Sequence, residues 1–124
     1  MHRYFGVRLV DPDRRHLGCW FIASESAQGR EGQLNGGVLS LLLDATAYLA
    51  LEPSLGPDED AVSHDLHISM LRSVMVGQRV DLRGELVQRG RRVAFVNSEA
   101  RVDGRLVATA RITKTIVQKP AATA

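Results

Sequence analysis

The pattern of apolar and polar positions sets one segment of the chain apart from the rest. From Val38 to Leu51, apolar residues occupy every side of a helix and leave no polar stripe for solvent. A helix of this kind has to be buried, so we expect a central helix over residues 36–51. Pro53 and Pro57 end it, because proline has no N–H to donate and disfavours helix in the residue before it.

The segments around this helix have the alternation and the β-branched content of strands. Two strands are expected before it, at residues 4–10 and 16–23, and four after it, at residues 61–71, 79–88, 92–102 and 106–117. Arg89-Gly90-Arg91 and Asp103-Gly104 are the predicted hairpin turns between the last three. Alternation in the first strand after the helix predicts an apolar face with Val62, Leu66, Ile68 and Met70 and a polar face with Ser63, Asp65, His67 and Ser69.

This order of elements predicts an α+β fold, in which a curved antiparallel sheet of five to six strands wraps one long central helix. With 124 residues and 44% hydrophobic content, we expect a single domain over residues 1–118 and a disordered tail at 119–124.

The single cysteine, Cys19, excludes an internal disulfide, and we interpret it as an inert buried thiol. The chain has no long apolar run and no signal-peptide pattern at its start, which predicts a cytoplasmic protein without a membrane partner. The net charge of +2 and the scattered arginines predict no nucleic-acid partner.

The central helix combines a glycine pair at its start with a single acid in its apolar body. Gly36 and Gly37 leave the first backbone N–H groups uncovered, and these donors, with the helix dipole, can hold an oxyanion. Burial of Asp44 disfavours its charged form, so hydrogen-bond donors should surround it, and Ser63 is the candidate donor. The structural alternative is an acid that only bonds a neighbouring strand.

These residues resemble the hotdog-fold acyl-CoA thioesterases of the phenylacetate-pathway, or PaaI-like, type. In that family the helix begins with His-Gly-Gly and carries an acid nine residues after the histidine. Here Asn35-Gly36-Gly37 and Asp44 match this pattern, with asparagine in place of histidine. Looser strand patterns at residues 63–72, 89–95 and 103–108 extend the resemblance over about residues 4–116.

The resemblance implies hydrolysis of a thioester by water. Asp44 would be the general base or nucleophile, a glycine N–H at the helix start would polarise the carbonyl, and Ser63 aligns with a serine that helps to hold the attacking water in some members. Asn35 can replace the family's histidine or simply cap the helix. Gly29 stands where many members have an amide side chain that helps to bind the thioester, a role that Gln28 or Gln33 can take instead.

The spacing of the helix residues adds a prediction about assembly. Gly37 and Asp44 are seven residues apart, which is roughly 10 Å along a helix and too far for both to serve one carbonyl carbon. We therefore expect two chains to share each site, in a homodimer with two equivalent sites. Further assembly into a homotetramer is also expected.

Several further residues are candidates for substrate binding. Arg91 and Arg92, beside Gly90, can grip the phosphates of coenzyme A, although a solvated hairpin is the simpler interpretation. The other candidates are Arg72, Gln33 and His64, of which His64 can equally be a core histidine. His64 and His67 point to opposite faces of a strand, so no metal site is predicted, and coenzyme A is expected only as part of the substrate.

The sequence thus favours an acyl-CoA thioesterase of unspecified acyl preference. A carrier-protein thioester fits the same features. The changes at Asn35 and Gly29 favour a different class, a non-catalytic hotdog module that binds acyl-CoA or serves as a scaffold. A hotdog dehydratase or hydratase is a third possibility, but its longer histidine-and-aspartate pattern is not found here.

Overall fold

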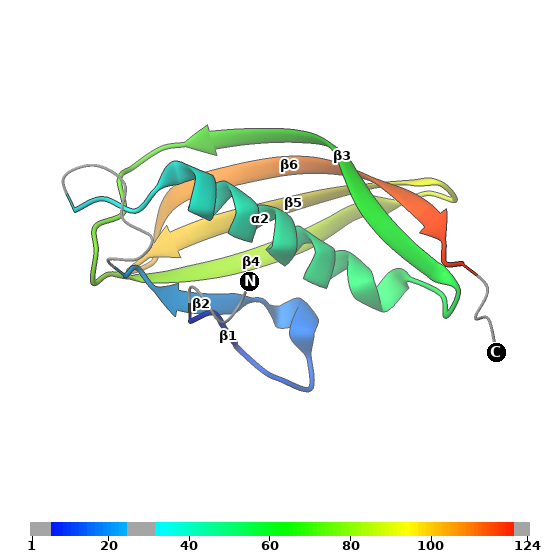
Figure 1. Cartoon of the computed structure of the whole chain (residues 1–124), viewed down its shortest axis with the longest axis horizontal. Coiled ribbons are helices and arrows are strands. Elements are labelled where there is room, and N and C mark those ends of the chain that lie inside the picture. Colours follow the sequence, from blue (N-terminus) through cyan, green and yellow to red (C-terminus); the bar gives the residue numbers. More distant parts are fainter. Residues whose placement is uncertain (1–5, 25–31, 121–124) are drawn as a thin grey trace.

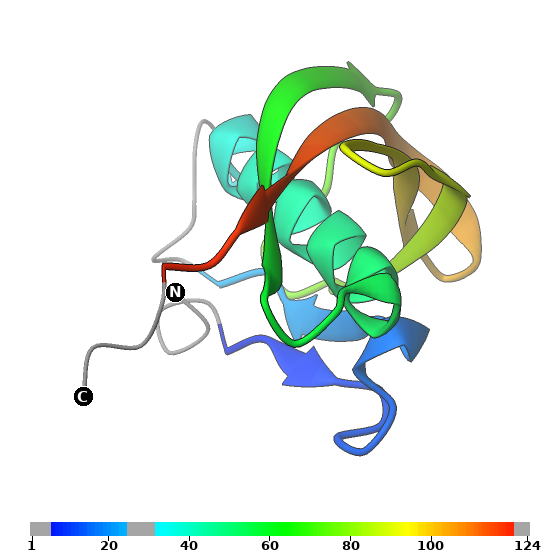
Figure 2. The same cartoon turned by 90° about the vertical axis from the view of Figure 1, so that its right-hand side faces the viewer.

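The computed structural model describes residues 6–24 and 32–120 of the chain. In this part, one α-helix, α2 (Gly36–Leu51), crosses the concave side of a six-stranded antiparallel sheet (Figure 1). The strand order is β1-β2-β4-β5-β6-β3. The strands are β1 (Arg8–Leu9), β2 (Cys19–Ile22), β3 (Glu59–Met70), β4 (Arg79–Arg89), β5 (Val93–Val102) and β6 (Arg105–Gln118). Seen from one end of the molecule, the sheet curves around the helix, as predicted (Figure 2).

The helix begins and ends where the apolar segment predicts. Asn35 is the N-cap, and its Oδ1 accepts a hydrogen bond of 2.7 Å from the Gly37 N–H. Pro53 lies in the short 3-10 helix η3 (Glu52–Ser54) that follows. Most of the apolar residues of α2 are buried against the sheet, namely Leu39, Leu42, Leu43, Ala47, Leu49 and Leu51. Leu41 is 44% exposed, so the sheet of one chain leaves part of the helix uncovered.

A glycine on β4 brings the helix close to the sheet. A Cβ added at Gly84 would lie only 2.8 Å from the Thr46 carbonyl oxygen and from the Ala50 Cβ. Close by, the buried Ser98 hydroxyl donates to the Leu43 carbonyl oxygen at 2.8 Å. The backbone of α2 is therefore held at a fixed height above β4 and β5, which fixes where its other residues point.

The first part of the chain contains less strand than the sequence predicts. β1 has two residues, and Arg15–Leu17 form a 3-10 helix, η1, where the start of the second strand was expected. The reason is Gly18, whose φ of +103° breaks the extended path and whose missing Cβ lets it approach the Leu82 carbonyl oxygen. Residues 4 and 5 of the predicted first strand lie outside the described residues.

β3 contains a bulge, so the residues before it lie on the opposite faces from those that the alternation predicts. Its pairing with β6 shifts register at His64, so that Ser63 pairs with Lys114 and Leu66 pairs with the buried Ile112. Ser63 and Leu66 therefore share the inner face of the sheet, and Val62 lies on the outer face. The prediction that placed Val62 with Leu66 and opposite Ser63 was wrong, because one extra residue in a bulge reverses the faces on one side of it.

β3 is an edge strand of this sheet, and β6 ends at Gln118, two residues before the end of the described chain. The N–H of Lys119 donates to the Asp58 carbonyl oxygen at 2.7 Å, and residues 121–124 of the predicted tail lie outside the described residues. Within the described part of the chain, no helix is both long enough and apolar enough to cross a membrane.

Candidate active site

Asp44 lies on the side of α2 that faces the pair formed by β3 and β6. The Ser63 hydroxyl donates to Asp44 Oδ1 at 2.5 Å, and the Lys114 ammonium donates to the same oxygen at 3.1 Å. Lys114 Nζ also donates to Ser63 Oγ at 2.7 Å, which closes a triangle. We call Asp44, Ser63 and Lys114 the Asp44 cluster. The donors predicted around this acid are present, and Ser63 is one of them.

The two charged members of the Asp44 cluster differ in exposure. The Lys114 side chain is 3% exposed and that of Asp44 is 31% exposed. Both hydrogen bonds to Asp44 end on Oδ1, and no described residue bonds Oδ2. The carboxylate is thus fixed through one oxygen and open through the other. This arrangement suits a general base that takes a proton from a water molecule.

Sequence reasoning missed Lys114, although a signal was present. Ile112, Lys114 and Ile116 follow one another at every second position of a strand, and the two isoleucines are buried. A lysine within an apolar stripe has to be paired with an acid or another acceptor. The only acid in the apolar helix is Asp44, so the pairing could have been proposed.

Tyr48 lies one helical turn after Asp44 and also contacts an acid on β3. Its hydroxyl donates to Asp60 Oδ1 at 2.7 Å, and this bond raises the pKa of Tyr48 to about 12 and lowers the pKa of Asp60. The Lys114 Nζ lies 5.7 Å from the centre of the Tyr48 ring, within the range of a cation–π contact. Lys114 therefore contacts two residues of α2 that are one turn apart, Asp44 and Tyr48.

The helix start forms a second part of the candidate site. The Asn35 side chain occupies the Gly37 N–H, so capping is what Asn35 does in this structure. No described residue accepts a hydrogen bond from the Gly36 N–H. A pocket of about 330 Å³ opens beside it, and Gln33, Gly36 and Arg72 are among the residues that line it. Three sequence candidates therefore meet at this pocket.

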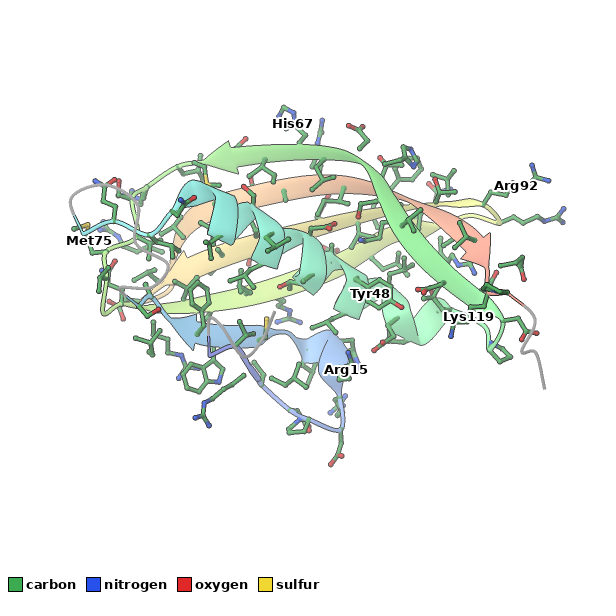
Figure 3. All side chains as sticks on the ribbon, in the orientation of Figure 1. Arg15, Tyr48, His67, Met75, Arg92 and Lys119 are labelled. Atoms are coloured by element: carbon green, nitrogen blue, oxygen red, sulfur yellow. The ribbon has the colours of Figure 1, made fainter. Side chains whose placement is uncertain are left out.

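Within one chain, the helix start and the Asp44 cluster do not meet. Gly36 and Asp44 are eight residues apart on one straight helix, which corresponds to roughly 12 Å. Arg91 and Arg92 lie in the turn between β4 and β5 and are exposed. In Figure 3, Arg92 is at the end of the molecule opposite to Met75, which lies near the helix start.

Two other candidates are placed away from Asp44. His64 is the bulge residue of β3, and its Nδ1 lies 2.6 Å from the Thr115 Oγ1. Because Thr115 pairs with Val62 on the outer face of the sheet, His64 lies on the face opposite to Asp44, neither in the core nor at the acid of its own chain. Gln28 and Gly29 lie outside the described residues.

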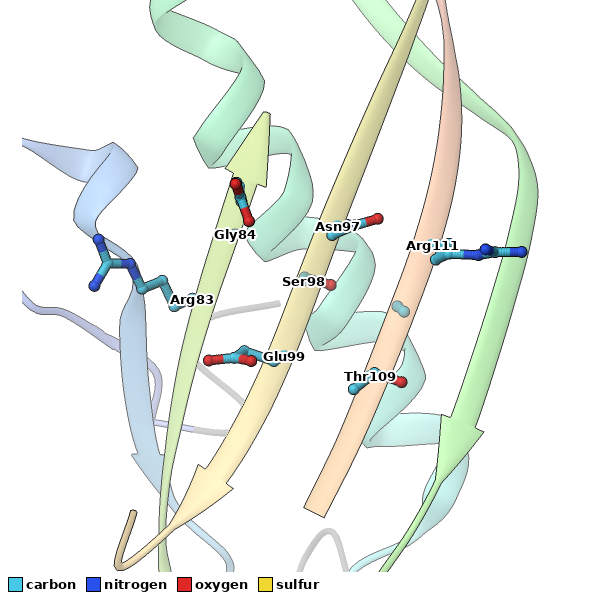
Figure 4. Close-up of a pocket in the computed structure, with 9 residues that line it drawn as sticks. Arg83, Gly84, Asn97, Ser98, Glu99, Thr109 and Arg111 are labelled. Carbon is cyan, nitrogen blue, oxygen red and sulfur yellow. The ribbon is translucent and has the colours of Figure 1, made fainter. Parts of the chain in front are cut away.

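The outer face of the sheet carries a separate pocket of about 640 Å³ (Figure 4). Its lining includes Arg83, Asn97, Glu99 and Arg111 but no residue of the Asp44 cluster.

Cys19 is buried with its Sγ 3.5 Å from Thr46 Oγ1, and burial raises the pKa of its thiol. Among residues 6–24 and 32–120, no three His, Cys, Asp or Glu side chains are placed to hold a metal ion.

The sequence from a few residues before α2 into β6 matches a known family. Residues 31–109, more than half of the chain, fit the sequence model of the thioesterase superfamily. The chain belongs to the thioesterase superfamily. A search of curated proteins gives no match.

Solved structures agree with this membership. A phenylacetic acid degradation-related protein from Ralstonia eutropha JMP134 is 30% identical, with a TM-score of 0.79 over 92% of this chain and 87% of that chain. A thioesterase from Haemophilus influenzae is 20% identical, with a TM-score of 0.83 over 94% of this chain and 82% of that one. A Bacillus halodurans protein solved with CoA is 18% identical, with a TM-score of 0.81 over 91% and 72%. The predicted hotdog fold and the predicted family are therefore confirmed.

Proposed function

We propose that this member of the thioesterase superfamily hydrolyses acyl-CoA thioesters to a free acid and CoA, at sites shared by two chains. The observation that carries this proposal is the Asp44 cluster, in which one carboxylate oxygen is fixed and the other is open. A Gly36 N–H at the start of the same helix, for which no described residue is an acceptor, supports it. Family membership supports thioester hydrolysis in general.

In the proposed reaction, a water molecule donates a hydrogen bond to Asp44 Oδ2. The water oxygen attacks the thioester carbonyl carbon while Asp44 takes its proton. The carbonyl oxygen becomes an oxyanion and accepts a hydrogen bond from the Gly36 N–H at the positive end of the helix dipole. Collapse of the tetrahedral intermediate breaks the carbon–sulfur bond, and the CoA thiolate leaves with the proton held by Asp44.

A second chain is required to bring these two parts together. Three large apolar side chains on the helix side of the sheet are nearly half exposed, Leu41 at 44%, Leu66 at 44% and Met70 at 46%. The last two belong to the edge strand β3. We infer that β3 pairs antiparallel with the β3 strand of a second copy, which would cover this apolar face and the open strand edge.

This pairing would also bring the arginines near the turn between β4 and β5 of one chain close to the helix start of the other. A two-fold axis near Leu66 would set the start of one β3 strand beside the end of the other. Arg89, at the end of β4 and next to the turn that contains Arg91 and Arg92, is paired with Glu59 at the start of β3. Met70, at the other end of β3, lies near Gly36. The arginines of one chain would then lie beside the helix start of the other, where the CoA phosphates would emerge. The CoA in the Bacillus halodurans structure supports a ligand of this class. A homotetramer built from two such dimers stays a prediction.

Substrate class is tested by thiol release from short, medium, long and aromatic acyl-CoAs, with crotonyl-CoA hydration and acyl-carrier-protein thioesters measured in parallel. Release from CoA esters supports the proposal. Binding of acyl-CoA without any release would favour the non-catalytic module, and hydration without release would favour the hydratase. An Arg91→Ala and Arg92→Ala double variant should raise KM for CoA esters more than for pantetheine esters, and equal effects would contradict phosphate binding.

Shared sites are tested at Gly36. Proline is tolerated at the first position of a helix, and Asn35 already has the extended ψ of 126° that a following proline prefers. Gly36→Pro should therefore remove the N–H and the activity but keep the fold. Gly36→Ala is the matched control, because its Cβ would lie 3.8 Å from Met70 Cε and its N–H is kept. Mixed dimers of Gly36→Pro and Asp44→Ala chains should regain part of the activity, and no recovery would contradict shared sites.

A further inference from the structure

Lys114 is the most deeply buried ionised group that contacts the candidate site. It stands between Ile112 and Ile116 on the inner face of β6, and its side chain is 3% exposed. Asp44 is the only acid that forms a salt bridge with it in the described part of the chain. A buried ammonium without a counter-charge is strongly unfavourable, so the contact between Lys114 and Asp44 has to be maintained in the folded protein.

The hydrogen bonds of the cluster also use both the hydrogen and the oxygen of the Ser63 hydroxyl. Its hydroxyl hydrogen is donated to Asp44 Oδ1 at 2.5 Å, and its oxygen accepts from Lys114 Nζ at 2.7 Å. A hydroxyl has one hydrogen to donate, so in this arrangement Ser63 has none for the attacking water. Lys114 and Ser63 together fix the position of Oδ1, and rotation of the carboxylate is blocked from two directions.

We propose that Lys114 is a positioning residue for hydrolysis, which fixes Oδ1 of Asp44, so that Oδ2 alone receives the proton of water. This inference rests on the proposed thioesterase function. It assigns Ser63 to the orientation of the carboxylate rather than to the binding of water. It also excludes Ser63 as an acylated nucleophile, because an ammonium paired with Asp44 has no lone pair with which to deprotonate the hydroxyl.

The chain offers a matched control for a test of this role. It has two lysines, and the other one, Lys119, is exposed. In Lys114→Met, which keeps the length of the stem but removes the charge, we expect kcat to fall about 10- to 100-fold, below the full contribution of a general base. KM should change less than about twofold, because Lys114 does not touch the substrate. Lys114→Arg should recover part of kcat, and Lys119→Met should equal wild type.

The outcomes separate the two proposals. If wild type and Lys119→Met release no thiol from any ester, both the function and the role of Lys114 are wrong. If they are active and a folded Lys114→Met has the same kcat, only the role of Lys114 is wrong. An acyl group found on Ser63 by mass spectrometry of the reacting enzyme would also overturn it.

A measurement that leaves Lys114 in place covers the case in which Lys114→Met does not fold. In protein labelled with 15N-lysine, the two ammonium groups are observed directly by NMR. The Lys114 signal should be protected from exchange with water and should shift in Asp44→Asn, while the Lys119 signal exchanges freely. A Lys114 signal that exchanges as fast as that of Lys119, or that is insensitive to Asp44→Asn, would contradict the proposal.

Discussion

The pairing of Asp44 with Lys114 predicts an asymmetric effect on stability. Replacing one member by an apolar residue of similar size leaves the other charge without its partner, whereas replacing both leaves no unpaired charge. The variants are Asp44→Leu, Lys114→Met and the double variant. Because Lys114 is 3% exposed and Asp44 is 31% exposed, the ammonium left alone is the more costly of the two.

The expected magnitudes follow from this difference. Asp44→Leu should lower the free energy of unfolding by about 3–5 kcal/mol, the usual cost of an unpaired buried charge. Lys114→Met should cost less, about 1–3 kcal/mol, because the remaining carboxylate keeps its bond from Ser63 and reaches solvent. For a domain of this size, each kcal/mol lowers Tm by about 4 °C, so the Tm of Asp44→Leu should fall by about 12–20 °C.

The assay is thermal unfolding followed by circular dichroism at one fixed chain concentration, because dimerisation makes Tm depend on concentration. We expect the double variant to be more stable than Asp44→Leu alone, which gives a coupling energy of about 2 kcal/mol or more. Additive effects of the two substitutions would refute the pairing, and a larger loss of stability in Lys114→Met than in Asp44→Leu would refute the asymmetry.

Three other predictions concern the packing of α2 on β4, the helix start and the contact of Tyr48 with Asp60. Gly84→Ala should lower the free energy of unfolding by about 1–3 kcal/mol, because its Cβ would lie 2.8 Å from the Thr46 carbonyl oxygen, and urea unfolding measures it. Asn35→Ala should cost about 1 kcal/mol by loss of the cap, while Asn35→Asp should not. Tyr48 should ionise near pH 12 by its absorbance at 295 nm, and Asp60→Ala should bring this ionisation down toward the ordinary value of 10.0. Since the folded pKa is the higher one, the stability from this contact is present below about pH 10 and lost as pH rises through about 12.

Much of the fold could be predicted from the sequence, because it depends on local pattern. The apolar segment fixed both ends of α2, since glycine and proline at its borders act locally. The four strands after the helix were predicted to within two residues at each end, because each has alternating residues and is bounded by a loop or turn. The late start of β2 was not predicted, because the close approach of Gly18 to Leu82 is a tertiary contact.

The candidate site was predictable only in part. Asp44 and Gly36 stand out because an acid and a glycine pair are unusual in an apolar helix. Ser63 was a candidate, yet the sheet face on which it lies was predicted wrongly, because the bulge at His64 cannot be recognised from the alternating pattern of the sequence. Lys114 was missed because its partner is 70 residues away, and only the pairing of β6 with β3 beneath the helix brings them together.

The most direct test of the account is steady-state thiol release by wild type, Asp44→Asn and Asp65→Asn on the best acyl-CoA ester. Asp44→Asn keeps an oxygen that can accept from Ser63 and Lys114 but cannot take a proton, and Asp65 is an exposed acid whose partner in the sheet, Thr113, lies on the outer face. We predict a loss of kcat of about 10²–10⁴-fold in Asp44→Asn, as for the removal of a general base, and wild-type turnover in Asp65→Asn. A folded, dimeric Asp44→Asn that turns over like wild type would contradict the assignment of Asp44 as the catalytic acid–base group.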